Sequence, residues 1–194
     1  DSPSRIMKTT NGFQQAYNAQ AAVEVDSRLI LASPVVDAAN DKEQLVPTFR
    51  AIDPVIQSVD EVLIDSGFVS EAAIRQIEHD TEGQRTGVTV LAAVKREAHG
   101  RTVAQLERQA DPPPPPTEAP FTERLAHRTA TVAGQRYKLR QQTVEPVFGI
   151  IKEALGFRRF SLRSLPKVSL EWTLVCLAYN LKRLHRLGIS PQHA

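Results

Sequence analysis

The stretch that decides the fold is VDEVLIDSGFVSEAAIRQIEH, residues 59–79. Its short apolar run, residues 62–64, ends at Asp65 and predicts a buried strand. Ser70 is placed to cap a following helix, and Glu71 lies in the first turn of that helix. The carboxyl end of a buried strand is the edge where α/β sheets usually hold their chemistry, so Asp65 is a candidate functional residue.

Segments before and after residues 59–79 also predict strands. Residues 15–25, QAYNAQAAVEV, alternate between apolar and polar side chains. Residues 28–36, RLILASPVV, follow a turn signal, so the two segments predict a hairpin, with Pro34 at an edge or a bulge. Glu24 stands at the end of the first strand, on its polar face. Residues 87–97 predict one more apolar strand.

A helix is predicted between the hairpin and the strand of residues 62–64. Its sequence is LVPTFRAI, residues 45–52, where Asn40 or Asp41 can act as the cap and Pro47 should introduce a kink. The order is therefore strand, strand, helix, strand, helix, strand. This order predicts a mixed α/β layer.

The pattern changes after residue 97. Residues 98–120 are rich in proline, with five consecutive prolines at 112–116, and predict a stiff linker or an exposed loop. Helical signals return over residues 121–187, and the final helix carries an apolar stripe that includes Cys176 as a small buried residue. The predicted segments are a connector (1–14), the first part of the core (15–97), the linker (98–120), the helical part (121–187) and a tail (188–194).

The composition is that of an ordinary globular protein of 194 residues, 41% hydrophobic and 24% charged. No apolar run is long enough for a membrane span, and the polar first residues do not form a signal peptide. The single cysteine excludes an internal disulfide and a thiolate zinc cluster. We therefore expect a cytoplasmic protein without a membrane partner. Because the chain begins at Asp1, we also expect an upstream part.

The net charge of +2 conceals an asymmetry. Residues 135–194 hold eleven Lys and Arg against three acids, a net of +8, which leaves −6 for the remaining residues. A basic C-terminal third indicates a polyanion partner, and an acidic remainder is compatible with metal-binding carboxylates. The alternative is a pair of solvated faces of opposite sign.

Three acids stand where the predicted fold presents them: Glu24, Asp65 and Glu145. Carboxylates without a cysteine or histidine cluster are hard oxygen ligands, which suit Mg²⁺ or Mn²⁺. Two such ions can activate a water and stabilise the leaving oxygen of a phosphodiester. Each acid also has a purely structural interpretation: Glu24 as a solvent-facing residue beside a turn, Asp65 as a turn cap, and Glu145 as a complement to a helix dipole. The residues alone lead only to metal-dependent phosphodiester chemistry as one option.

The segment TVEPVFGIIK, residues 143–152, predicts an amphipathic helix around the third acid. Pro146 is tolerated in a first turn but not in a helix interior, so the helix either starts at about Thr143 or is kinked beside Glu145. Lys152 lies two turns on and is placed to touch a phosphate.

Two residues upstream add further groups suited to a phosphate. Tyr137 supplies a hydroxyl and Arg140 a guanidinium fork, eight and five residues before Glu145. We therefore group them with Lys152 as candidate contacts to a nucleic-acid backbone.

The stretch YKLRQQTVEPVFGIIKEALGFRRFSLRSL, residues 137–165, resembles the C-terminal signature of DDE-type insertion-sequence transposases. In that signature Tyr, Arg, Glu and Lys follow one another on and before a helix; here they are Tyr137, Arg140, Glu145 and Lys152. Residues 11–47 and residues 62–72 resemble the first and second catalytic strands of the same family.

The resemblance implies a ribonuclease-H-like mixed sheet with flanking helices and a helical C-terminal third. It implies two Mg²⁺ or Mn²⁺ ions held by Glu24, Asp65 and Glu145, which cleave double-stranded DNA at transposon ends and join those ends to a target. Arg158 and Arg159, in the same stretch, join the residues expected to bind DNA phosphates. The implied setting is the cytoplasm, at the nucleoid, and a homodimer is one assembly the family suggests.

The chain departs from the family pattern at two points. The first acid is usually Asp, whereas Glu24 carries an extra methylene that moves its carboxylate by about 1 Å, a displacement that can cost roughly 100-fold in rate. Asp26, two residues on, could take its place. The interval from Arg140 to Glu145 is also one residue longer than the common form.

Two other functions stay open at this point. One is a catalytically impaired transposase remnant that retains only DNA binding through its basic C-terminal third. The other is an interaction protein that uses the proline tract as a docking segment.

Overall fold

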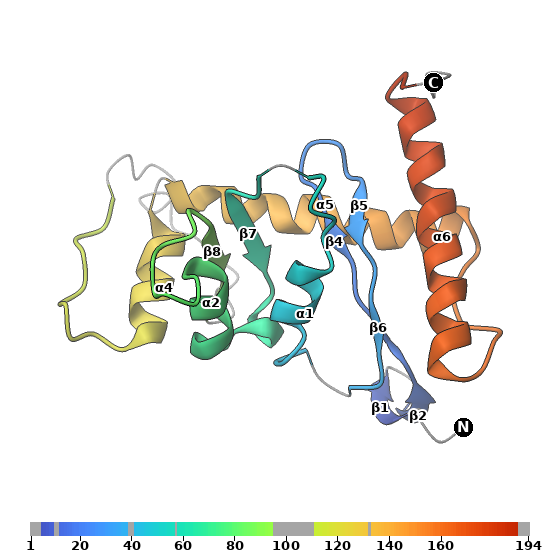
Figure 1. Ribbon diagram of the computed structural model, residues 1–194, viewed down its shortest axis with the longest axis horizontal. Helices are drawn as coiled ribbons and strands as arrows, with labels where there is room; N and C mark the ends of the chain where they lie inside the picture. Colours follow the sequence, from blue (N-terminus) through green and yellow to red (C-terminus); the bar gives the residue numbers. More distant parts are fainter. Residues whose placement is uncertain are drawn as a thin grey trace. The chain divides into compact units, whose positions relative to one another are not determined.

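In the computed structural model, residues 5–9, 12–38, 41–56, 58–94, 111–131 and 133–189 are described, and they form five α-helices and several two-stranded sheets (Figure 1). They divide into unit 1, Asp1–Ile56 with Gln141–Ala194, and unit 2, Gln57–Arg140. The mixed α/β class is confirmed. The single ribonuclease-H-like sheet stays a prediction, because the described strands pair only two by two. The predicted segment boundaries likewise stay predictions.

Unit 2 is built on a parallel strand pair. β7 (Glu61–Ile64) pairs with β8 (Thr89–Ala92) in the register Glu61↔Thr89 to Ile64↔Ala92. Between them lie the 3-10 helix η1 (Ser66–Phe68) and α2 (Glu71–Glu78). The Ser70 side chain accepts from the backbone N–H of Ala73, so the predicted cap is confirmed.

The remaining elements of unit 2 complete its core. α4 (Phe121–Ala130) packs against β8, and the 3-10 helix η2 (Ala133–Lys138) follows it. The buried apolar side chains come from the strands and from α2 and α4; they include Ile64, Ile74, Ile77, Val90, Leu91 and Leu125. The five consecutive prolines, residues 112–116, lie in neither a helix nor a strand.

An ion pair with one buried member, Glu78, joins three elements of unit 2. Glu78, 4% exposed at the end of α2, pairs with Arg128 of α4, and its Oε1 also accepts from the backbone N–H of Val90 in β8 at 2.9 Å. Arg128 donates to the carbonyl oxygen of Val90 at 3.0 Å. The charges are thus matched by hydrogen bonds, the condition for burying them without a large penalty.

Unit 1 contains the predicted hairpin, which is confirmed in two short ladders. β3 (Asn18–Ala19) pairs antiparallel with β6 (Val35–Val36), and β4 (Ala22–Val23) pairs antiparallel with β5 (Ile30–Ala32). The register shifts between Ala22 and Val23, and Pro34 falls between the two ladders, which agrees with the expected irregularity.

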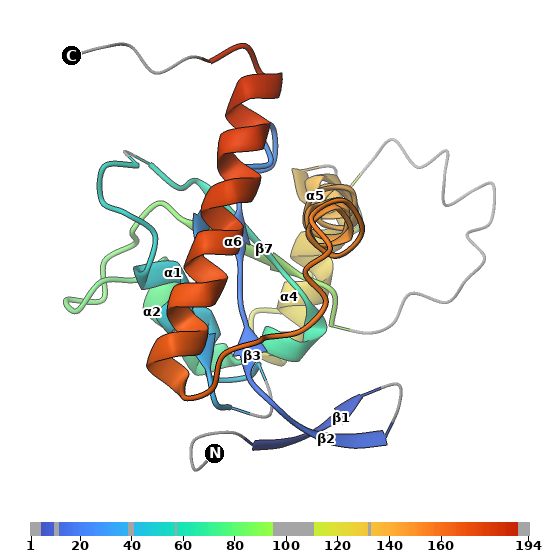
Figure 2. The same cartoon turned by 90° about the vertical axis from the view of Figure 1, so that its right-hand side faces the viewer.

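A second strand pair precedes this hairpin. β1 (Arg5–Thr9) and β2 (Gly12–Ala16) pair antiparallel, within and just beyond the segment predicted as a connector (Figure 2). This pair was not predicted, although the sequence Asn11-Gly12 between the two strands is typical of hairpin turns.

The helix α1 (Leu45–Arg50) differs in its cap from the prediction. Gln44 is its N-cap residue without a side-chain hydrogen bond, while Asp41 accepts instead from the side chains of Asn18 and Gln20, at 2.7 and 2.8 Å. Asn40 lies outside the described residues. Pro47 is the third residue of α1, in the first turn, where the missing N–H removes no helical hydrogen bond and a kink is not required.

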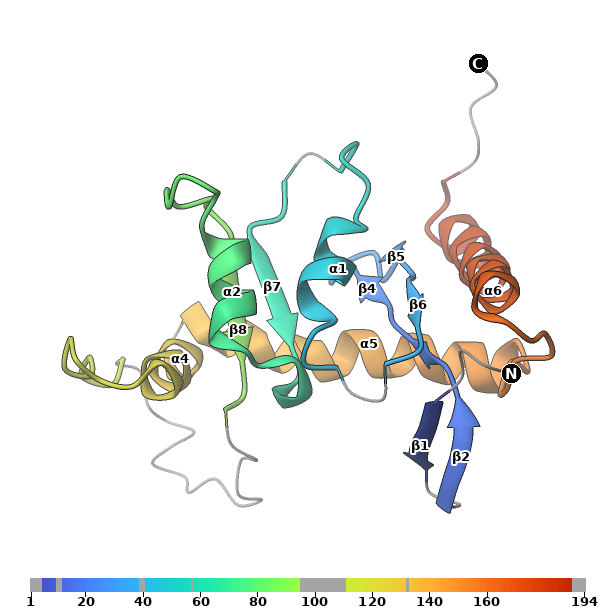
Figure 3. The ribbon, with the colours of Figure 1, turned by 60° about the horizontal axis from the view of Figure 1, so that its bottom comes forward.

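Figure 3 shows the helix α5 (Leu139–Gly149). It contains Pro146 in its interior, so the predicted alternative of a start at about Thr143 is wrong, and a kink beside Glu145 stays a prediction. Pro146 cannot donate to the carbonyl oxygen of Gln142, but Gln142 is exposed and water can serve that oxygen. A π-helical segment η3 (Ile150–Ala154) follows directly, a wide turn of the kind found where a helix accommodates an irregularity.

The last helix, α6 (Leu165–Arg186), covers the core of unit 1. Its buried residues Val168, Trp172, Cys176 and Tyr179 pack with Ile30, Val35, Val147 and Ile151. The predicted burial of Cys176 is confirmed, and that burial raises the pKa of its thiol to about 11.

Polar side chains of α6 also reach the hairpin backbone. Trp172 Nε1 donates to the carbonyl oxygen of Gln20 at 3.0 Å, and the Tyr179 hydroxyl donates to that of Arg28 at 3.0 Å. α6 therefore fixes the hairpin, and with it the turn that carries Glu24.

Candidate functional site

Asp65 lies where the sequence predicted it, directly after β7. It is the N-cap residue of η1, and its Oδ1 accepts from the backbone N–H of Ser66 at 2.7 Å. The side chain is 55% exposed, and Arg140 Nη2 lies 3.8 Å from Oδ1. The carboxylate thus caps a turn and also faces a cation, with much of its surface open to solvent.

Arg140 is the partner of Asp65 within unit 2. Its side chain is only 17% exposed, and Nε is buried without a hydrogen-bond partner among the described residues. A buried guanidinium donor without a partner is uncommon and costs free energy. The guanidinium therefore retains donor capacity beside an exposed carboxylate.

Glu24 lies in the turn that joins β4 to β5. Its Oε1 accepts from the backbone N–H of Asp26 at 3.0 Å and its Oε2 from that of Ser27 at 2.5 Å. Burial alone would raise the pKa of this carboxyl, but hydrogen bonds from the Ser27 side chain and from the backbone of residues 25–27 outweigh it and hold the pKa below its usual value. Both oxygens are thus engaged by the turn, while Asp26 itself is exposed.

Glu145 is exposed on α5, one residue before Pro146. It belongs to unit 1 together with Glu24, whereas Asp65 belongs to unit 2. Over the described ranges, no group of three or more His, Cys, Asp or Glu side chains gathers as at a metal site. The convergence of Glu24, Asp65 and Glu145 therefore stays a prediction.

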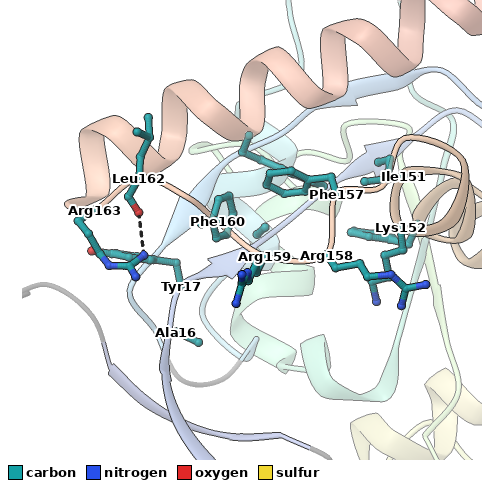
Figure 4. Close-up of a pocket in the computed structure, with 13 residues that line it drawn as sticks. Ala16, Tyr17, Ile151, Lys152, Phe157, Arg158, Arg159, Phe160, Leu162 and Arg163 are labelled. Atoms are coloured by element: carbon teal, nitrogen blue, oxygen red, sulfur yellow. Dashed lines mark hydrogen bonds between the residues drawn. The ribbon is translucent and has the colours of Figure 1, made fainter.

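Three of the predicted phosphate-binding residues do lie together in unit 1. Lys152, Arg158 and Arg159 line one cavity of about 560 Å³ (Figure 4). We call it the aromatic pocket, because its other lining residues include the rings of Tyr17, Phe148, Phe157, Phe160 and Trp172. Tyr137 and Arg140, the other two predicted phosphate contacts, belong to unit 2.

The rings of the aromatic pocket pack on one another. Phe148 stacks on Trp172 with centroids 5.9 Å apart and planes at 14°, while Phe160 meets Phe157 edge-on at 5.3 Å. Phe160 also contacts Trp172 and Tyr17, both at 6.4 Å. Each ring is therefore held by its neighbours, which gives the pocket a defined aromatic lining.

The cations of the pocket differ in their partners. Arg158 Nη2 pairs with Glu153 at 2.5 Å, and Arg163 donates to the carbonyl oxygen of Leu162 at 3.2 Å. For Lys152 and Arg159, both exposed, no ion pair is found in the part of the chain that the structure describes. These two side chains are thus the cations most available to an anionic ligand.

The aromatic lining was missed by the sequence analysis. The signal was present in GFRRF, residues 156–160, where Phe157 and Phe160 flank Arg158 and Arg159. Aromatic residues interleaved with basic ones are typical of surfaces that bind nucleic-acid bases. The rest of the lining, from Tyr17 and Trp172, comes from distant parts of the chain and required the fold.

Residues 116–185 match the family model described as a transposase DDE domain. The matched segment contains Glu145 and the basic residues of the aromatic pocket, but neither Glu24 nor Asp65. No curated protein and no solved structure matches the chain. Among the described residues, none of the helices is long and apolar enough to span a membrane.

Proposed function

We propose that this chain is the catalytic portion of a DDE-type transposase, an assignment that the family match over residues 116–185 supports. It cleaves double-stranded DNA at the ends of an insertion sequence and joins those ends to a target. The acids assigned to catalysis and metal binding are Glu24, Asp65 and Glu145.

The observation that carries this proposal is the contact between Arg140 and Asp65. Arg140 Nη2 lies 3.8 Å from the carboxylate of the second acid, within unit 2. Arg140 is also the second residue of α5, the helix on which Glu145 follows five residues later. Within unit 2 the contact thus joins two residues of the proposed site, the second acid and a residue of the family signature.

The chemistry of the donor set fits a divalent ion for two of the three acids. Asp65 and Glu145 present exposed carboxylates, the hard oxygen ligands that Mg²⁺ and Mn²⁺ prefer. Glu24 fits less well, because both of its oxygens accept hydrogen bonds from its own turn. When bound, a pair of ions would supply activation of a water or hydroxyl and stabilisation of the leaving oxygen.

The basic side chains of this chain would position the DNA backbone. Lys152, Arg158 and Arg159 share the aromatic pocket and can bind phosphate oxygens, Lys152 as a point charge and the arginines through their forks. Arg140, whose side chain is 17% exposed, and Tyr137, which precedes it in η2, complete the proposed set of phosphate contacts. Phosphate contacts fix register and orientation without reading sequence.

The direct test is cleavage of a labelled duplex that carries the terminal repeats flanking the gene, with Mg²⁺ or Mn²⁺. We expect Asp65→Asn and Glu145→Gln each to abolish cutting and leave duplex binding intact. Glu123→Gln, at an exposed acid in α4, is the matched control and should cut normally. If both variants of the assigned acids cut like the parent protein, the proposal is wrong.

A second candidate is a remnant that binds DNA without cutting it. The engagement of Glu24 by its turn favours it, since a first acid committed to capping is poorly placed to hold an ion. Duplex binding that persists in EDTA and falls steeply with salt, with no cleavage in either metal, would favour this candidate. A comparison of Asp26→Asn with Glu24→Gln identifies which of the two residues is the first acid. Only the substitution that neutralises a metal-binding carboxylate should reduce DNA cleavage.

A further inference from the structure

We propose that the exposed face of α6 is an interface between two copies of this chain, whose α6 helices pair in antiparallel orientation. The inference goes beyond the proposed function and does not rest on it, because the pairing requires neither DNA nor a metal ion. It rests on a second apolar face of a helix whose first apolar face already covers the core of unit 1.

The second face is a row of leucines along α6. Their side chains are 66, 65, 51 and 56% exposed, in the order Leu170, Leu174, Leu177 and Leu181. Thr173 and Ala178 are the remaining exposed residues of this described stretch, so the exposed positions from residue 170 to residue 181 are uncharged. We call these residues the leucine face.

The opposite side of α6 is already covered. Val168, Trp172 and Cys176 are buried there against the core of unit 1, and Figure 1 shows β5 and β6 on one side of the helix. A helix that is apolar on both sides is normally covered on both, and a continuous row of exposed leucines marks a contact surface. The leucine face is therefore a surface for a partner to cover.

The partner that the leucine face fits is a second copy, because the spacing of the leucines is self-complementary. The intervals between successive leucines are four, three and four residues, which read the same in both directions. A two-fold axis at the middle of the row therefore sets Leu170 against Leu181 of the second copy, and Leu174 against Leu177 of the second copy. The same intervals alternate between the a and d positions of a heptad, whose side chains interlock between paired helices.

The charges of α6 favour the antiparallel orientation. Lys182, Arg183 and Arg186 lie in its last turns, whereas its acid, Glu171, lies near its start. A parallel pair would bring two basic ends together, where like charges repel. An antiparallel pair separates the basic ends and brings Glu171 near Lys182 of the second copy, a residue that is exposed and has no ion pair among the described residues.

Glu171 is oriented by its own chain for this contact. Its carboxylate accepts hydrogen bonds from the backbone N–H of Ser161 at 2.9 and 3.1 Å and from that of Leu162 at 3.0 Å. A carboxylate held in this way loses little freedom when a cation of the second copy approaches. The ion pair thus sets the direction of pairing, while burial of the leucines supplies most of the affinity, since exposed ion pairs contribute little.

The first test measures the mass of the full chain by sedimentation, in EDTA and without DNA, from about 5 to about 200 μM. We expect the mean mass to rise with concentration from that of one chain toward that of two. Leu174→Glu places a charge in each half of the interface and should weaken the association by about 10-fold or more. Val55→Glu, at an 82% exposed valine of unit 1 outside α6, is the matched control and should associate like the parent protein.

Cysteine cross-linking tests the orientation. An equal mixture of Leu170→Cys and Leu181→Cys, treated with oxidised glutathione, should form a disulfide between the two variants, whereas neither variant alone should cross-link. The native Cys176 is 4% exposed and lies on the core side of α6, so it does not interfere. Cross-linking of each variant with itself overturns the antiparallel pairing.

A parent protein with the mass of one chain at every concentration overturns the proposal. Thermal unfolding checks that each variant is folded, and Leu177→Gln replaces Leu174→Glu if the latter is not. If the parent is a monomer and Leu174→Glu lowers its unfolding temperature, the leucine face packs within its own chain, which also overturns the proposal. A protein that dimerises through the leucine face but never cuts terminal-repeat duplexes retains the interface and loses the transposase activity.

Discussion

Asn180 forms a two-way hydrogen-bond pair with the backbone of Ile30. Its Oδ1 accepts from the Ile30 N–H at 2.9 Å, and its Nδ2 donates to the Ile30 carbonyl oxygen at 2.8 Å. The side-chain amide of α6 thus completes the edge of β5 in the way that a neighbouring strand would. It holds the hairpin that carries Glu24 against the core of unit 1.

Replacement of this amide by an apolar group of similar size should be costly. Asn180→Leu leaves the N–H and the carbonyl group of Ile30 without partners, and each such buried group costs about 1–3 kcal/mol. We expect the free energy of unfolding to fall by about 2 kcal/mol or more in urea titrations. Lys182→Gln, at an exposed position of the same helix, should change it by less than about 0.5 kcal/mol. Equal effects of the two substitutions would show that the pair does not anchor the hairpin.

The pair of buried Glu78 and half-buried Arg128 should contribute measurably to the stability of unit 2. Glu78→Gln removes the charge from the buried partner of Arg128, whose side chain is 33% exposed, and weakens the charge-assisted hydrogen bonds between them, a change that typically costs about 1.5–3 kcal/mol. The exposed pair of Glu71 and Arg75 in α2 offers the control, since such surface pairs contribute about 0–1 kcal/mol. Chemical unfolding of Glu78→Gln and Glu71→Gln should therefore give clearly different losses, and similar losses would contradict the assignment.

The local pattern of the sequence predicts the elements well where side-chain periodicity decides them. The alternation of residues 15–25, the apolar run before Asp65 and the Ser70 cap all correspond to observed structure. Of the two alternatives predicted for the helix around Glu145, the start at about Thr143 is wrong, because α5 tolerates Pro146 in its interior, where proline is normally disfavoured.

The sequence predicts less of what depends on contacts between distant residues. Asp41 was one of the two residues predicted to cap α1, with Asn40 as the alternative, but its side chain accepts hydrogen bonds from Asn18 and Gln20, more than twenty positions earlier in the chain. Nor does any spacing rule connect Asn180 with Ile30, or Tyr17 with Phe160. The same holds for the carboxylates of the candidate site. Three acids far apart in the sequence carry no local signal that predicts whether they come together in the fold.

The backbone of Arg28 is in a conformation that favours glycine. Its φ is 58°, in the left-handed region, where a side chain costs roughly 1 kcal/mol. Arg28→Gly should relieve this cost while its carbonyl oxygen keeps the hydrogen bond from the Tyr179 hydroxyl. We expect a gain of about 0.5 kcal/mol in the free energy of unfolding after the entropy cost of glycine. Arg28→Ala retains a Cβ and should bring no gain, so stabilisation by alanine as well would point to the arginine side chain rather than the backbone.

The cap formed by Glu24 should appear in the pH dependence of stability. The pKa of Glu24 in the folded chain lies below its ordinary value of 4.5, so its contribution is present above that value and is lost as the pH falls through the lower folded pKa. Unfolding measured from neutral pH into the acid range should show Glu24→Gln less stable than the parent protein at neutral pH, with the difference shrinking as the pH falls. The same variant tests the site. If Glu24 only caps its turn, Glu24→Gln lowers the stability of the protein but leaves the rate of cleavage per folded molecule unchanged. A stability difference that does not change with pH would mean that the Glu24 carboxylate does not cap the turn in solution.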